Sequence, residues 1–315
     1  MAKRFLASES MRVAVLCGLT SSLFVLSRVF FSSLPFVALL SLFISVPLFF
    51  AYLSCGQKEG FLSLSIVFLV TVLFCKIEII ADISLKEILP VSIIGYLATK
   101  SITIKKKTWW YPESRLLIQL AVISMVSLAF MSVTFFTNEK IRAIYDVVVE
   151  KGILVAANKP EADMAAINAL FSRFSKYFLG FVFFFQMLAT LFNFQLSHFL
   201  SLKLKKNIRP KFDFLNLSSP YYISVIPIVS LTIANLVPGL HFTFSSLAVA
   251  GLFMPTVCGF SIVHFYAKER KQKNILVIAY LMLLIFPLLI ILFMAAIGVI
   301  DSFFPVRREL QKKRY

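Results

Sequence analysis

The sequence lacks the motifs that accompany nucleotide, metal or nucleophile chemistry. It contains no P-loop, no Gly-x-Ser-x-Gly elbow, no His-Glu-x-x-His pair and no Gly-x-Gly-x-x-Gly loop. Its four cysteines stand inside apolar runs with no Cys-x-x-Cys spacing, and its three histidines have no metal-ligand spacing. We therefore expect no enzymatic activity, no cofactor, no metal and no ATP hydrolysis by this chain itself.

Charged residues are also scarce. They make up 15% of the 315 residues, whereas 59% are hydrophobic and 35 are phenylalanine. A soluble domain carries about 25% charged residues. The basic residues that give the net charge of +17 are clustered between apolar runs. This is the positive-inside pattern of a membrane protein, so we expect a lipid bilayer rather than nucleic acid as the partner.

Long uncharged runs predict an all-α, polytopic bundle of eight or nine transmembrane helices. The last run, Ile275–Ile300, has 26 residues and would be about 39 Å long as one helix, enough to cross a bilayer. The stretch Ile77–Thr99 carries four charges and allows three interpretations: a span with a charged outer turn, a broken helix or a re-entrant piece. The other expected spans are Val13–Ser27, Val29–Cys55 with a kink at Pro47, Phe61–Cys75, Leu116–Phe136, Tyr177–Leu202, and two within Phe214–Ala267 divided near Pro238–Gly239.

The chain divides into a transmembrane half at 1–136, a polar insert at 137–175 and a second transmembrane half at 176–315. The insert has the pattern of two amphipathic helices on the membrane surface. The positive-inside rule places three basic loops, 100–115, 203–211 and 268–273, on the cytoplasmic side. With nine spans, the N-terminus is then expected to be cytoplasmic as well. A straight last span then places the basic tail outside, against the same rule.

A polar stripe follows one face of the span Tyr177–Leu202. It has two interpretations: hydrogen bonding between helices, worth about 0.6 kcal/mol per contact, or the wall of a pocket for a polar solute. Charged residues four apart in Ile77–Thr99 are either a functional group at membrane depth or a solvated pair in an outer loop. The candidate solute-facing residues are Gln186, Thr190, Asn193, Ser197, Asp82 and Glu78, and Ser201 and Lys86 continue the two spacings.

A second group lies near the C-terminus. Asp301 follows an apolar run at the expected C-terminal end of a helix, where the helix dipole disfavours an anion. It therefore calls for a cationic partner, and Arg307 or Arg308 is nearest in sequence. His264, one turn before Lys268, is read as an interfacial hydrogen bonder or, less readily, a proton carrier. We expect His264, Asp301 and Arg307 to form a structural clasp or a gate.

Several short motifs follow one another along the chain: Pro47-Leu-Phe-Phe-Ala-Tyr-Leu-Ser-Cys-Gly56, Trp110-Tyr111-Pro112 with Arg115, Asn193 with Arg209-Pro210, Asp213 and Pro220, and His264 with Arg270, Tyr280, Gly298, Asp301 and Arg307. In their order and spacing the chain resembles the YybS-like family of bacterial integral membrane proteins, in its alphaproteobacterial form. One departure is Phe303, where the family has a tryptophan after the aspartate.

The resemblance implies a multi-pass protein of the bacterial inner membrane. The family is distantly similar to the substrate-binding membrane subunits of energy-coupling-factor vitamin transporters. That likeness implies a protein that binds or transports a small solute, energised by separate subunits that hold the ATPase. The alternative, suggested by the amphipathic insert, is a non-transporting scaffold for envelope assembly or division.

Overall fold

The computed structural model describes residues 2–31, 34–137, 175–304 and 307. The chain forms two compact units, one from residues 1–123 and 186–217 and the other from residues 124–185 and 218–315. Two of the three unit boundaries fall inside helices, α7 (Glu113–Thr137) and α10 (Phe178–Lys203), and the third follows Leu217. Nearly all of the expected amphipathic insert, and with it the basis of the scaffold hypothesis, lies outside the described residues.

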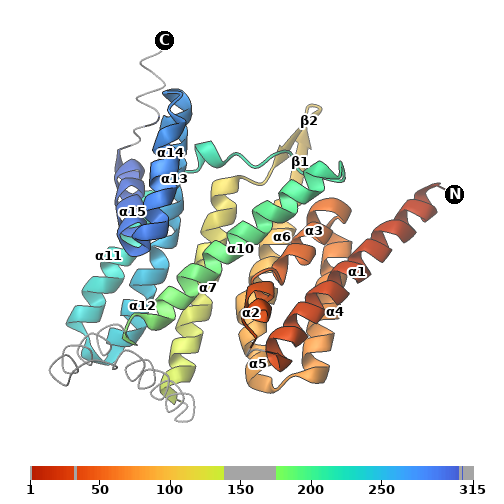
Figure 1. The fold of residues 1–315 in the computed structure, drawn as a ribbon, viewed down its shortest axis with the longest axis horizontal. Coiled ribbons are helices and arrows are strands. Elements are labelled where there is room, and N and C mark those ends of the chain that lie inside the picture. The colour runs from red at the N-terminus through yellow and green to blue at the C-terminus, as the bar shows by residue number, and fades with distance from the viewer. Residues whose placement is uncertain (1, 32–33, 138–174, 305–306, 308–315) are drawn as a thin grey trace. The chain divides into compact units, whose positions relative to one another are not determined.

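The first unit consists of short and long helices that succeed one another along the chain with short connections (Figure 1). Helix α1 packs against α3 and α4, and α6 packs against both of these. A small antiparallel hairpin then precedes α7. The elements are α1 (Ala2–Phe30), α2 (Pro35–Ser41), α3 (Ser45–Cys55), α4 (Gln57–Phe74), α5 (Ile77–Ile83), the π turn η1 (Ser84–Ile88), α6 (Leu89–Ala98), β1 (Ser101–Ile104) and β2 (Lys107–Trp110), with η2 (Phe214–Asn216) after α10.

The expected kink at Pro47 is a full break placed just before it. The chain leaves helical geometry between α2 and α3, and Pro47 then sits in the first turn of α3, where its missing N–H breaks no helical bond. Helix α3 ends at Gly56, whose φ of 110° suits glycine. Between these ends the Tyr52 ring packs against Gly60 and Gly95, where an added Cβ would lie 2.4 and 2.5 Å from ring carbons.

The stretch Ile77–Thr99 is helical from Ile77 to Ala98, because α5, η1 and α6 follow one another without a gap. This continuity argues against a broken helix, while the span and the re-entrant piece both stay predictions. A path of this length is about 33 Å long, close to the thickness of a hydrocarbon core. Its π turn is irregular, and such turns are frequent at functional sites.

The second unit confirms the division near Pro238–Gly239, since a short 3-10 turn separates α11 from α12 there. Helices α12 and α13 together form the apolar segment His241–Glu269. The elements, besides parts of α7 and α10, are α11 (Tyr221–Leu236), η3 (Pro238–Leu240), α12 (His241–Gly251), α13 (Phe253–Glu269), α14 (Lys273–Ile285) and α15 (Pro287–Phe303).

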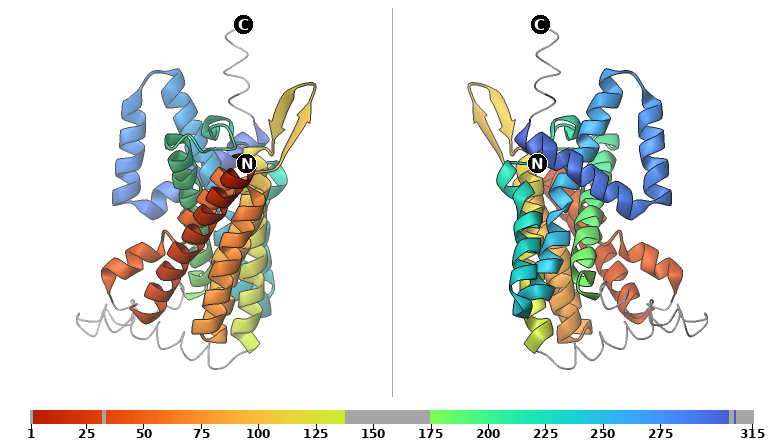
Figure 2. Two further views of the ribbon diagram at one scale, coloured as in Figure 1. Left: turned by 90° about the vertical axis from the view of Figure 1, so that its right-hand side faces the viewer. Right: turned by 90° about the vertical axis from the view of Figure 1, so that its left-hand side faces the viewer.

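The prediction of one straight helix over Ile275–Ile300 is wrong. The chain turns at Phe286, where φ is −129° and ψ is 63°, and Pro287 starts a new helix. Helix α14 runs back along α13 (Figure 2). A contact of 2.7 Å between the His264 Nε2 atom and the Tyr280 hydroxyl joins the two helices. At 13 and 17 residues, α14 and α15 are about 20 and 26 Å long, each short of a 30 Å core.

Helices α13 and α15 cross with backbone against backbone. A Cβ added at Gly259 would lie 1.9 Å from the Met294 carbonyl oxygen, and one added at Gly298 would lie 1.9 Å from the Pro255 carbonyl oxygen. Small residues at such crossings are typical of helix association in membranes, where close packing replaces the hydrophobic effect. The last helix is therefore held to the unit along its middle.

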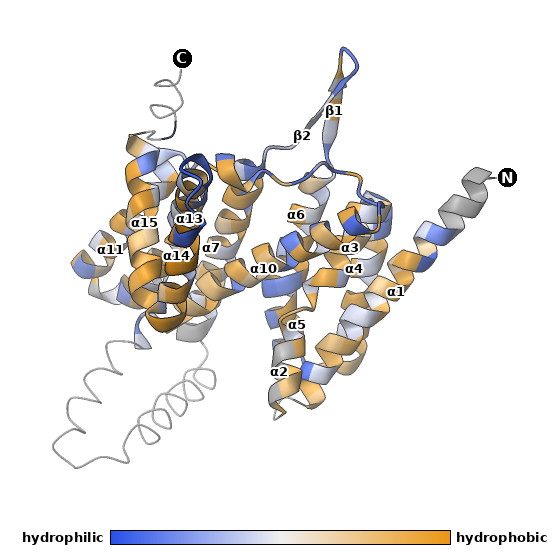
Figure 3. Ribbon diagram, turned by 45° about the horizontal axis from the view of Figure 1, so that its top comes forward, coloured by the Kyte–Doolittle hydropathy of each residue, from blue (hydrophilic) through white to orange (hydrophobic). Residues whose placement is uncertain are grey.

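Helices dominate the described residues, and the residues of these helices are largely apolar (Figure 3). The hairpin β1–β2 is an exception to the all-α expectation. Five described segments are long and apolar enough to cross a membrane: Glu9–Phe30, Gln57–Phe74, Glu113–Thr134, Phe178–Lys203 and His241–Glu269. Four more apolar helices are shorter, namely α3, α11, α14 and α15. The total of eight or nine spans stays a prediction.

Candidate functional site: a buried carboxyl beside a helix break

The candidate site centres on Glu87, which lies in the π turn about half way along the path from Ile77 to Ala98. Its side chain is buried, with 6% of its surface exposed. It occupies a position in the buried stripe of this path, which continues through Ile83, Val91 and Ile94. A carboxyl at membrane depth is costly unless partners compensate it, and such groups mark functional sites.

Two side chains from other helices donate hydrogen bonds to this carboxyl. The Ser45 hydroxyl, at the start of α3, donates to Oε2. The Gln186 amide, on α10, donates to Oε1 at 2.8 Å and to the Lys86 carbonyl oxygen at 3.1 Å. A hydrogen bond contributes about 0.5–1.5 kcal/mol net, and a buried acceptor left without one costs about 1–3 kcal/mol. Three separate segments of the chain therefore meet at one carboxyl.

The break between α2 and α3 lies along the same face of α10. The Asn193 amide donates to the Leu42 carbonyl oxygen at 2.7 Å, and the Ser197 hydroxyl lies 2.7 Å from the Val46 carbonyl oxygen. The first contact satisfies a carbonyl group of the break itself, whereas Val46 lies in the first turn of α3. The Asn193 Oδ1 atom is buried and has no hydrogen-bond partner among the described residues. The site thus keeps one unused acceptor.

The structure brings the predicted polar stripe together with the charged stretch, but unevenly. Gln186, Asn193 and Ser197 bond to other segments. Thr190 and Ser201 bond to carbonyl groups of their own helix, at 2.8 Å each.

Asp82 forms an ion pair with Lys86 and lies 3.4 Å from Arg28. Glu78 is exposed in the first turn of α5. Because Asp82, Lys86 and Arg28 are only partly buried, their ion pairs contribute little to the stability of the folded protein.

Sequence reasoning missed Glu87, Ser45 and Arg28 as members of this cluster. A signal for Glu87 was present: it stands four residues after Ile83 and four before Val91, on the apolar face of its own helix. The four-residue spacing of Asp82 and Lys86 drew attention to the wrong face. Nothing local marks Ser45, because its role depends on the break before it.

The predicted C-terminal group is only partly assembled. The Arg307 Nη2 atom lies 2.6 Å from Asp301 Oδ2, and Nη1 donates to the Ser261 hydroxyl of α13 at 3.1 Å. Both charged side chains are buried, each with 8% of its surface exposed. His264 instead pairs with Tyr280 of α14. The pair ties the end of α15 to α13, which is the geometry of a structural clasp.

The described residues contain no group of three or more His, Cys, Asp or Glu side chains that could hold a metal ion. The second unit contains an apolar cavity of about 550 Å³. Its lining includes Phe184, Val249, Pro287 and Leu292, and it offers no polar group to orient a solute. The first unit therefore holds the stronger candidate for solute chemistry.

Comparison of the sequence with known proteins identifies the family of the chain. No curated protein and no solved structure matches it. Residues 20–302 match the family described as "Predicted membrane protein (DUF2232)", a range that includes Glu87, the helix break, the polar stripe and the last helical hairpin. The chain is therefore a multi-pass integral membrane protein that belongs to the DUF2232 family.

Proposed function

We propose that the protein binds a small solute within the membrane and passes it across, and that the Glu87 carboxyl receives this solute. The supporting observation is the burial of Glu87 half way along a membrane-length helical path, next to an interrupted helix. Interrupted helices with polar partners at membrane depth are the usual binding sites of secondary transporters. The sequence lacks a P-loop, so energy comes from a gradient or from separate energising subunits.

The chemistry of the cluster favours a solute with a positive charge or several N–H donors. Its acceptors are the Glu87 carboxyl, the Asn193 Oδ1 atom and the Leu42 carbonyl oxygen, of which Asn193 Oδ1 is the one without a partner while the cluster is closed. An amine or a protonated nitrogen heterocycle offers the matching donors. These residues are closed on one another, so entry of the solute requires α10 to separate locally from the start of α3.

The test is a thermal-stability screen of the purified full-length protein in detergent. The panel contains protonated amines, cationic heterocycles, neutral sugars and carboxylic acids. A solute at 100 times its Kd stabilises the folded state by about 2.7 kcal/mol, a shift that is easily measured. We expect stabilisation by members of the first two classes and subsequent uptake of the same solutes into proteoliposomes.

Matched variants assign the effect to the site. Glu87→Gln keeps the shape of the side chain and removes its charge, so it should abolish the shift, whereas Glu78→Gln, at an exposed position of the same path, should retain it. Asn193→Leu should act like Glu87→Gln, with the exposed Asn235→Leu as its control. The proposal fails if no solute shifts the melting temperature, or if Glu87→Gln responds like the unmodified protein.

A further inference from the structure

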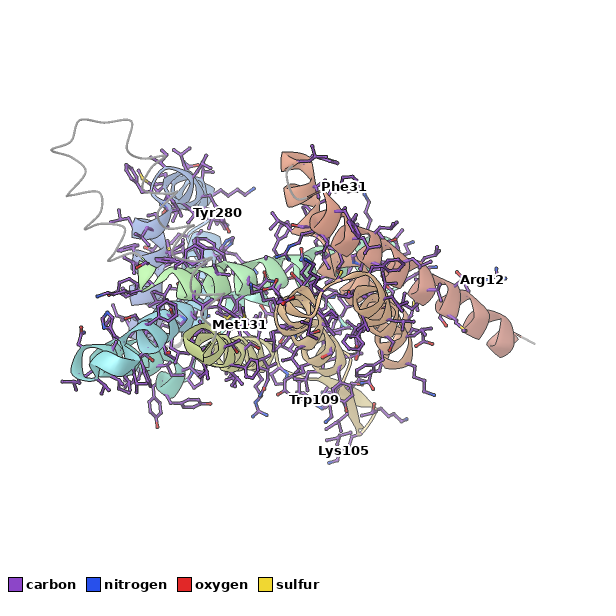
Figure 4. All side chains as sticks on the ribbon, turned by 90° about the horizontal axis from the view of Figure 1, so that it is seen from below. Arg12, Phe31, Lys105, Trp109, Met131 and Tyr280 are labelled. Carbon is purple, nitrogen blue, oxygen red and sulfur yellow. The ribbon has the colours of Figure 1, made fainter. Side chains whose placement is uncertain are left out.

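The hairpin β1–β2 carries an unpartnered surface of unusual composition. In its register Ile102 lies opposite Trp109 and Ile104 lies opposite Lys107, so these four side chains share one face. Ile102, Ile104 and Trp109 expose 60%, 56% and 63% of their surface. Figure 4 shows Lys105 at the tip and Trp109 on the body of the hairpin, away from the helices of the first unit. This apolar face has no covering element among the described residues.

The tip of the hairpin is strained and strongly basic. Lys105 and Lys106 have φ angles of 49° and 65°, a left-handed conformation that suits asparagine and glycine in a two-residue turn. Lys107 follows them, and no acidic residue occurs between Lys100 and Pro112. Strain of this kind persists where the conformation serves a function. The turn holds three consecutive lysines at the end of an exposed apolar face.

The position of the hairpin argues against lipid as its partner. Its base joins the end of α6 to the start of α7, and Figure 2 shows the strands continuing past those helix ends. Four residues per strand extend about 13 Å. Anionic headgroups would account for the lysines. The segment Glu113–Thr134 is long and apolar enough to cross a membrane, so the hairpin lies at the end of a candidate span and its strands carry Ile102, Ile104 and Trp109 beyond that end. An acidic protein surface with an apolar slot accounts for both.

We propose that the hairpin β1–β2 is a docking element for an acidic partner protein on the membrane surface, with Trp109 as its apolar anchor and Lys105–Lys107 as its charge contact. Tryptophan is enriched at the energetic centre of protein interfaces, and lysines at the rim steer an acidic partner into place. By the positive-inside rule this end of the first unit faces the cytoplasm. The inference is independent of the proposed solute binding.

The test is photo-cross-linking of the full-length protein in cells of its native host. A photoreactive phenylalanine analogue replaces Trp109 in one variant and Thr103, on the opposite face of the hairpin, in the control. We expect one discrete protein adduct at position 109. The yield of this adduct at position 103 should be at least about tenfold lower. The combination Lys105→Glu, Lys106→Glu and Lys107→Glu should reduce it about tenfold, whereas Lys268→Glu with Lys271→Glu, in another basic loop, should not.

Two further measurements separate the partner from misfolding and from lipid. Lys105→Asn with Lys106→Gly suits the turn better, so it should keep the melting temperature and still weaken the adduct. Both tryptophans of the chain lie in the hairpin, so intrinsic emission reports on it alone. The captured protein, once purified, should be acidic and shift this emission to the blue in nanodiscs.

The emission should be the same in phosphatidylglycerol and phosphatidylcholine nanodiscs. A lipid-dependent emission, an adduct with lipid alone, equal adducts on both faces or no adduct at position 109 would each overturn the proposal.

Discussion

Two glycines set how closely α13 and α15 approach each other. At Gly259 and Gly298 a methyl group would overlap a carbonyl oxygen of the facing helix, and a backbone atom cannot move aside as a side chain can. Each helix therefore presents a carbonyl group to the glycine of the other. The contact has no alternative packing, because no rotamer change relieves an overlap between backbones.

We expect Gly259→Ala and Gly298→Ala each to destabilise the protein by about 1–3 kcal/mol, the usual cost of overpacking. Alanine in a helix is otherwise stabilising relative to glycine, so the sign of the effect reports the clash. The measurement is thermal unfolding in detergent. The control is Gly239→Ala, where an added methyl group meets no atom within 4 Å. A neutral or stabilising result at both crossing positions would contradict this geometry.

Glu87 and Gln186 should be energetically coupled. Gln186→Leu leaves the buried carboxyl with one donor fewer, while Glu87→Leu removes the carboxyl itself. We expect the double variant to be less destabilised than the sum of the single variants, with a coupling of about 0.5–2 kcal/mol. Unfolding in detergent measures the cycle. Ser92→Ala, which removes a bond within its own helix, should be additive with Glu87→Leu, and additivity in both cycles would show that the bond contributes nothing.

At this scale the sequence predicts residue types better than partners. The helical spacing of Gln186, Asn193 and Ser197 correctly indicates side chains on one helix face. The helix-dipole argument correctly predicts a cationic partner for Asp301, which is Arg307. The partners of the stripe are the Glu87 carboxyl and the carbonyl groups of Leu42, in the break between α2 and α3, and of Val46, in the first turn of α3. Whether a carbonyl is unsatisfied depends on where a distant helix stops, which a local pattern does not contain.

At the scale of elements, the hairpin α14–α15 changes the expected topology of the C-terminus. Arg307 contacts Ser261 of α13, two turns before the basic loop 268–273 begins. The end of α15 therefore returns to the middle of α13. We predict that the chain after α15 lies on the same side of the membrane as that loop, which would bring its basic residues into agreement with the positive-inside rule.

This topology can be tested by labelling single cysteines in a variant without the four native ones. We expect cysteines at Gln272 and after Tyr315 to react with an impermeant maleimide from the same side of sealed vesicles. A cysteine at Leu288, next to the turn, should be protected from both sides. Labelling of the two outer positions from opposite sides would restore the straight span.

Hydropathy alone could not distinguish the two arrangements. An uncharged run of 26 residues has the same composition whether it crosses once or turns back, and Pro287 also fits a simple kink. The pairing of Tyr280 with His264 and the glycine contacts decide the outcome, and both are tertiary. The β1–β2 hairpin was missed for a related reason: its turn is Lys105–Lys106, which lacks the usual asparagine and glycine signal.

At the scale of the molecule, each compact unit takes residues from both sides of the polar insert. The first unit closes only when Gln186, Asn193 and Ser197 meet Glu87 and the helix break. The expected division at 1–136 and 176–315 follows the chain and is useful for topology. The units follow packing, which brings the second part of α10 back to the first part of the chain.

We therefore expect residues 1–150 expressed alone to be unstable, and to become stable when residues 151–315 are co-expressed. The measurement is co-purification of the two fragments with a tag on one of them. Gln186→Leu with Asn193→Leu should lower the yield of the complex, whereas Thr232→Ala with Asn235→Leu, at exposed positions, should not. A monodisperse, helical fragment 1–150 by itself would contradict this dependence.

The π turn at Ser84–Ile88 contains one residue more than an α-helical turn needs. If that extra residue were absorbed into regular helix, everything from Ile77 to Ile83 would rotate by roughly 100° against α6 and advance by about 1.5 Å. Asp82 would then leave Arg28, and Glu87 would turn from its donors without any helix being lost. A screw-like step of one residue is thus available to this path, and under the proposed function it would load and unload the Glu87 carboxyl.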